Sequence, residues 1–74
     1  MEKYKNYSGH SGVTHYEITP HAIRVKFKNS LSIYTYSDSK IAKYHIDRMK
    51  KLAQEGQGLS TYINQHSEIK ENYL

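Results

Sequence analysis

Three basic residues alternate with apolar residues between Arg24 and Lys28, and their spacing suits the binding of phosphate groups. Side chains two residues apart in an extended strand point to the same face, about 6 to 7 Å from one another. Arg24, Lys26 and Lys28 would therefore form a cationic row with a spacing close to that of successive phosphates in one nucleic-acid strand. This pattern predicts a surface that binds RNA or DNA. An ordinary solvated sheet face, whose charges oppose edge pairing, explains the same pattern equally well.

Three further basic residues are candidates for the same nucleic-acid surface. His15 lies in a preceding stretch that is expected to form a strand, and its side chain should point to the basic face. Lys50 and Lys51 lie in a stretch with helical periodicity, on its polar side. They are interpreted either as a solvated helix side or as additional contacts to phosphate.

Leu31 and Ile33 place two aliphatic side chains on the same face as the basic row. Exposed aliphatic pairs of this kind usually mark a covered surface. The cover would be the segment after Gly58, a second copy of the chain or a different protein. The alternative prediction is therefore a module for protein–protein interaction or homo-oligomerisation, with Leu31 and Ile33 in the interface.

Neither metal binding nor catalysis is predicted from the remaining polar residues. The chain has no cysteine, and its five histidines include no pair four residues apart on a helix. His45 and His66 lie on apolar helical stripes, where a hydrogen-bonded core histidine is the usual explanation. No serine lies in a nucleophile-elbow sequence, and no carboxylates are paired for acid–base chemistry. We expect a protein that is not an enzyme, with no metal, no cofactor and no small-molecule substrate.

The elements that position these residues are those of one small α+β domain. Residues 1–12 have no usable period and are interpreted as a flexible N-terminal arm. Residues 13–18, 23–28 and 31–36 are expected to form a three-stranded antiparallel meander sheet. An amphipathic helix and a second, shorter C-terminal helix should complete a single domain over residues 13–74. The apolar stripe of the first helix consists of Ile41, Ala42, His45, Ile46, Met49, Leu52 and Ala53.

The lengths of the two turns set which residues face the core. A two-residue turn at 29–30 puts Val25 opposite Tyr34 and Ile23 opposite Tyr36, so both tyrosines point inward. The turn around Pro20 puts Thr14 opposite Phe27 and leaves Val13 on the outer face with His15. A slip of one residue in the second hairpin would instead expose Tyr34 and Tyr36 beside the basic residues, as a stacking platform for bases.

The order of three short motifs resembles the KTSC-type domain, a module named for its occurrence at the C-terminus of some lysyl-tRNA synthetases. The motifs are Ile23-x-Val25-x-Phe27, the pair Tyr34-x-Tyr36, and the late segment Gly58-Leu59-Ser60-Thr61-Tyr62-Ile63. At Ser60 similar sequences often have Asn. The resemblance implies three strands followed by helix, and contact with RNA through the association with a synthetase. It implies no catalytic residues.

Length and composition agree with a small cytoplasmic protein. A chain of 74 residues with 36% hydrophobic residues can form one domain with a thin core. A net charge of +4 favours acidic partners. No stretch approaches the roughly 20 apolar residues of a membrane span, and the first residues lack the apolar region of a signal peptide.

Overall fold

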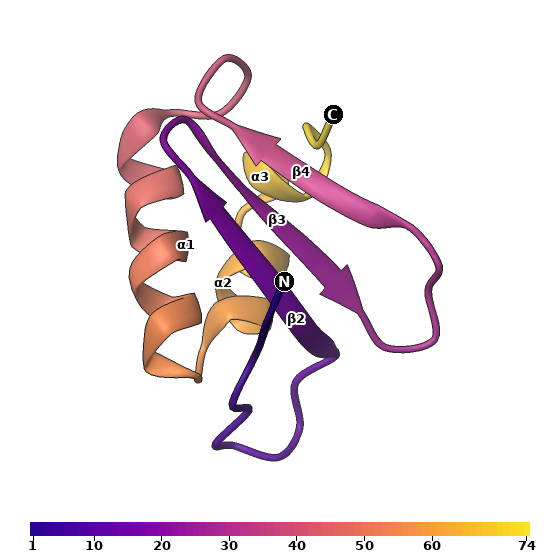
Figure 1. The fold of residues 1–74 in the computed structure, drawn as a ribbon. Coiled ribbons are helices and arrows are strands. Elements are labelled where there is room, and N and C mark those ends of the chain that lie inside the picture. Colours follow the sequence, from indigo (N-terminus) through magenta and orange to yellow (C-terminus); the bar gives the residue numbers. More distant parts are fainter.

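The computed structural model describes all 74 residues and contains one antiparallel sheet with three helices (Figure 1). The strands are β1 (Glu2–Lys3), β2 (Val13–Thr19), β3 (Ala22–Phe27) and β4 (Ile33–Ser37), and they lie side by side in that order. The helices are α1 (Lys43–Glu55), α2 (Leu59–Gln65) and α3 (Ser67–Lys70). The predicted α+β class with an antiparallel sheet is confirmed. The predicted numbers were wrong, since there are four strands and three helices rather than three and two.

The register of the central strands is the predicted one, although residues 28–32 join β3 to β4 where a two-residue turn at 29–30 was expected. Val25 lies opposite Tyr34, Ile23 lies opposite Tyr36, and Tyr16 lies opposite Val25. Tyr36 is buried and Tyr34 is half-buried, so the tyrosines face the helices rather than solvent. The alternative of an exposed aromatic platform is thereby excluded.

A bulge near the start of β2 changes the predicted pairing of Val13. The register shifts between Val13 and His15, so Val13, and not Thr14, lies opposite Phe27. One extra residue in a bulged strand reverses the faces of all residues before it. Val13 therefore joins the core instead of the outer face.

The N-terminal segment is part of the folded unit, so its assignment as an arm outside residues 13–74 was wrong. Glu2 and Lys3 pair with Tyr16 and His15 of β2. Tyr4 is only 2% exposed, and its hydroxyl oxygen accepts a hydrogen bond of 3.3 Å from the backbone N–H of Leu59. A strand of two residues is too short to produce a periodic pattern, which is why the sequence did not reveal it.

The helices cover one face of the sheet and complete the core. Figure 1 shows α2 and α3 behind the strands and α1 beside them. On α1 the predicted stripe is buried except at Ala42, which is the exposed residue that precedes the helix. His66 adopts an extended backbone and separates α2 from α3, which brings Ile69 into the core. The expected single C-terminal helix is therefore two short ones.

No helix has the length and apolar character needed to cross a membrane.

Candidate functional site

The face of the sheet opposite the helices carries a row of basic residues that crosses three strands. Lys3 of β1 lies opposite His15 of β2, and His15 lies opposite Lys26 of β3. We call Lys3, His15 and Lys26 the cationic row. Lys3 was missed from the sequence because its segment was interpreted as an arm.

The cationic row carries charge that the protein itself does not neutralise. The four ion pairs of the structure involve neither Lys3 nor Lys26. Lys3 and Lys26 each lie opposite His15, so the two lysines are on strands that flank the same residue. Moreover, the Nδ1 atom of His15 is buried and has no hydrogen-bond partner. An anion on this face would find two lysines that have no carboxylate partner, so the row is suited to binding negative groups.

Arg24 and Lys28 contribute to this face less than their spacing predicts. Arg24 lies opposite Glu17, and its Nη1 atom donates a hydrogen bond of 2.9 Å to Glu17 Oε1. The pair is half-exposed, and its charges cancel locally. Lys28 follows the last residue of β3, and its backbone N–H donates to the carbonyl of Gly12 at 2.6 Å. Lys28 is exposed, but it lies outside the strand.

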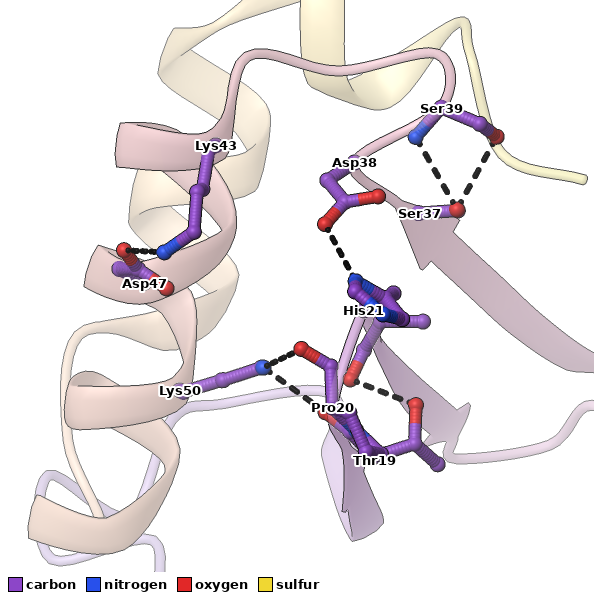
Figure 2. A network of polar contacts seen from close by, with 10 residues as sticks. Thr19, Pro20, His21, Ser37, Asp38, Ser39, Lys43, Asp47 and Lys50 are labelled. Atoms are coloured by element: carbon purple, nitrogen blue, oxygen red, sulfur yellow. Dashed lines mark hydrogen bonds and ion pairs between the residues drawn. The ribbon is translucent and has the colours of Figure 1, made fainter.

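Lys50 and Lys51 lie in the helix layer and not on the outer sheet face. The Lys50 ammonium donates to the carbonyl oxygens of Thr19 at 2.8 Å and Pro20 at 3.2 Å (Figure 2). These bonds tie α1 to the turn between β2 and β3. The same turn is held to the end of β4 by His21, whose Nδ1 lies 3.1 Å from Asp38 Oδ2. Lys51 is exposed on α1, so the structure does not bring either lysine to the cationic row.

Of the two predicted interface residues, Ile33 adjoins the cationic row. Ile33 lies opposite Lys26 and is 39% exposed, while Leu31 is fully exposed in the loop between β3 and β4. Both predicted interface residues therefore reach solvent. Only Ile33 belongs to the sheet itself.

A second polar cluster lies where the three helices meet. His45 of α1 is 4% exposed, and both of its ring nitrogens have partners. Its Nδ1 lies 2.7 Å from the Tyr62 hydroxyl, and its Nε2 lies 3.0 Å from Glu68 Oε1. His66 adds a bond of 2.7 Å from its Nδ1 to the Tyr62 carbonyl oxygen. We call His45, Tyr62, His66 and Glu68 the helix-junction cluster.

The helix-junction cluster perturbs two of its ionisable groups. A hydrogen bond from its own backbone N–H, supported by the bond to His45, lowers the pKa of the Glu68 carboxyl. Burial raises the pKa of the Tyr62 phenol. Glu68 thus stays an anion and Tyr62 a neutral hydroxyl around neutral pH. Helical histidine pairs and cysteines are local signals in a sequence, whereas these residues come from α1, from α2 and the residue after it, and from α3, so the cluster was not predicted.

A hollow of about 280 Å³ opens between the sheet and the last two helices. It is lined by Phe27, Ser30, Tyr34, Tyr36, Ile63, Asn64, Lys70 and Tyr73. Burial, with smaller effects from Tyr34 and Tyr73, raises the pKa of Tyr36 to about 12. The lining contains no carboxylate and no imidazole, and its ionisable groups are Lys70 and the three tyrosines.

No known protein family, no curated protein and no solved structure matches this chain. The resemblance to KTSC-type domains therefore stays a prediction.

Two groups of residues thus have the chemistry of a site. The cationic row presents positive charge on an open surface, and the helix-junction cluster gathers two imidazoles and a carboxylate. The cationic row suits an extended anionic partner. The helix-junction cluster suits a small ligand such as a proton or a metal cation.

Proposed function

We propose that this protein is a non-catalytic module that binds nucleic acid through the cationic row, with RNA as the first candidate. The observation that carries the proposal is the alignment of Lys3, His15 and Lys26 across three strands without a carboxylate opposite any of them. RNA is placed before DNA because of the resemblance to a module that accompanies tRNA synthetases.

The geometry supports contact with a flexible, single-stranded backbone. Neighbouring strands lie about 4.8 Å apart, so the three residues of the row offer successive positions for phosphates. Ile33 lies opposite Lys26 and provides an apolar surface beside the charges. Only a few phosphates fit on so small a face. The affinity should therefore be modest and strongly dependent on salt.

A salt titration with short RNA and DNA strands tests this function. The logarithm of the affinity should fall against the logarithm of the salt concentration with a slope of roughly 2 to 4. The double variant Lys3→Gln plus Lys26→Gln should reduce the slope by about 1.4 to 1.8, because each lost phosphate contact removes about 0.7 to 0.9.

Lys51→Gln is the matched control, since it removes an exposed charge from the helix layer. It should leave the slope almost unchanged. The proposal fails if neither nucleic acid binds at low salt, or if Lys51→Gln lowers the slope as much as a substitution in the row.

Full exposure of Leu31 and partial exposure of Ile33 favour a second candidate, a module that self-associates or binds another protein. Sedimentation at several concentrations distinguishes it from the first. This candidate would be supported if the protein were a dimer and the double variant Leu31→Asp plus Ile33→Lys were a folded monomer. A strict monomer that captures no protein would count against it.

A further inference from the structure

Three potential metal ligands converge at the helix junction, from α1, from the residue between α2 and α3, and from α3. They are the imidazole nitrogens of His45 and His66 and the carboxylate of Glu68, and their donor atoms all lie within 4.8 Å of one another. We propose that His45 Nε2, His66 Nε2 and Glu68 bind one divalent transition-metal ion of the zinc type. This site is independent of the cationic row.

The donor set fits that class of ion. Two neutral imidazoles and one carboxylate form a ligand set found for zinc, with a fourth position left for water. Tetrahedral bonds of about 2.0 to 2.1 Å place neighbouring donors about 3.3 Å apart. His45 Nε2 and Glu68 Oε1 are already 3.0 Å apart. Magnesium and calcium, which prefer oxygen ligands only, fit this set poorly.

The hydrogen bond from His66 Nδ1 leaves the Nε2 atom of this ring available to bind a metal. A carbonyl oxygen can only accept, so the bond to Tyr62 requires the proton of His66 to reside on Nδ1. In the neutral ring the lone pair is then on Nε2. An imidazole that donates from Nδ1 to a backbone carbonyl and binds the ion through Nε2 is a common arrangement around metals.

His45 can accept a metal through a change of tautomer. Glu68 is an anion and only accepts, so His45 donates to it from Nε2. An ion at Nε2 requires that this proton leave. In the neutral ring the proton moves to Nδ1, and the Tyr62 hydroxyl, 2.7 Å away, changes from donor to acceptor. The number of protons is conserved, and the ion takes the place of the hydrogen bond between His45 and Glu68.

The surroundings hold His45 in place and leave the site accessible from solvent. His45 is buried on α1 and its ring packs against Tyr44, with 4.2 Å between ring centroids. Tyr62 holds His45 and His66 through separate oxygens, its hydroxyl and its carbonyl. The side chain of Glu68 is 56% exposed, so an ion can reach the site from solvent.

Calorimetric titration of the full chain with zinc, and separately with cobalt, tests the site. We expect one ion per chain. Removal of a ligand by His66→Ala or by Glu68→Gln should weaken the affinity by at least about tenfold, since even outer-shell partners of a metal contribute 10- to 100-fold. Glu68→Gln changes an exposed side chain, so it keeps the test valid if His66→Ala destabilises the fold.

Two controls separate this site from weak binding by surface histidines. The double variant His10→Ala plus His21→Ala removes two exposed imidazoles and should leave zinc affinity unchanged. Magnesium should produce no binding heat. In NMR spectra of the imidazole nitrogens, zinc should convert His45 from the Nε2–H to the Nδ1–H tautomer and leave His66 as Nδ1–H. The proposal would be overturned if zinc did not bind. It would also be overturned if binding survived in Glu68→Gln but was lost in the double variant His10→Ala plus His21→Ala.

Discussion

Tyr4 connects the N-terminal segment to the helices. Its ring belongs to the core cluster, which includes residues of the sheet and of all three helices, and its hydroxyl oxygen accepts a hydrogen bond from the N–H of Leu59, the first residue of α2. The sequence offers no periodic signal around it. A single buried tyrosine therefore makes β1 and the segment after it part of the domain.

Tyr4→Ala should destabilise the protein by about 3 to 5 kcal/mol, the usual cost of removing a large buried aromatic side chain. Tyr4→Phe should cost about 1 to 2 kcal/mol, because it leaves the buried N–H of Leu59 without an acceptor. Urea unfolding measures both values.

Tyr7 provides the control for Tyr4, since its side chain lies three residues further on and is 66% exposed. Tyr7→Ala should change the free energy of unfolding by less than about 1 kcal/mol. If Tyr4→Ala and Tyr7→Ala are equally mild, residues 1–12 are an arm after all.

At the scale of the element, the end of α1 is fixed by Gly56 and by the N-terminal segment that crosses it. Gly56 has a φ of 79°, in the left-handed region, and its N–H bonds to carbonyls in the last turn of the helix. The N–H of Tyr7 donates to the Gly56 carbonyl at 2.8 Å. A methyl group at Gly56 would lie 2.8 Å from Lys5 Cβ and 3.1 Å from the Tyr7 ring. This position therefore requires glycine for both conformation and space.

A comparison of Gly56→Ala with Gly9→Ala separates these two requirements. Gly9 has a φ of 77°, and a methyl group there meets nothing within 4 Å. Gly9→Ala should cost about 1 to 2 kcal/mol for the left-handed backbone alone. Gly56→Ala should cost an additional 1 to 3 kcal/mol, roughly, for overpacking. Equal losses in thermal or urea unfolding would show that the N-terminal segment does not press on the end of α1.

At the scale of the whole molecule, the core depends on tyrosines that must remain protonated. Burial raises the pKa of Tyr16, of Tyr62 and, to about 12, of Tyr36. Each ring keeps its hydroxyl at the margin of the packed region, where an ionised phenolate would lose solvation. The folded state therefore favours the neutral form of these groups.

The protein should consequently lose stability in alkaline solution. An unfolded tyrosine ionises at a pKa of about 10, whereas folded Tyr36 holds its proton to about 12. The folded state binds more protons in this interval, so the contribution of Tyr36 to the free energy of unfolding is constant below about pH 10 and falls as the pH rises to about 12. Tyr36→Phe should make the free energy of unfolding fall less steeply with pH between about pH 10 and 12.

Urea unfolding at a series of alkaline pH values measures this effect, and tyrosinate absorbance reports the ionisation itself. Tyr44→Phe is the control, because Tyr44 is exposed. An equal slope in Tyr36→Phe and the wild-type protein would show that Tyr36 is not the group responsible.

Local pattern was sufficient for the central part of the fold. The alternation of Ile23, Val25 and Phe27 with basic residues indicates a strand with one apolar face, and that face pairs in register with Tyr34 and Tyr36. The helical stripe of α1 is equally local. These features depend on residues within one or two turns of one another, so the sequence by itself determined them.

Contacts between distant segments were decided only by the tertiary structure. The bulge at Val13 depends on how β2 meets β3, and β1 exists because Tyr4 fits against α2. The helix-junction cluster needs α1 to pack against α2 and α3, since His45 is far from Glu68 in the chain. Spacing along a chain carries no information about such pairs. Packing brings them together, because burial of apolar faces fixes the helices and their polar side chains follow.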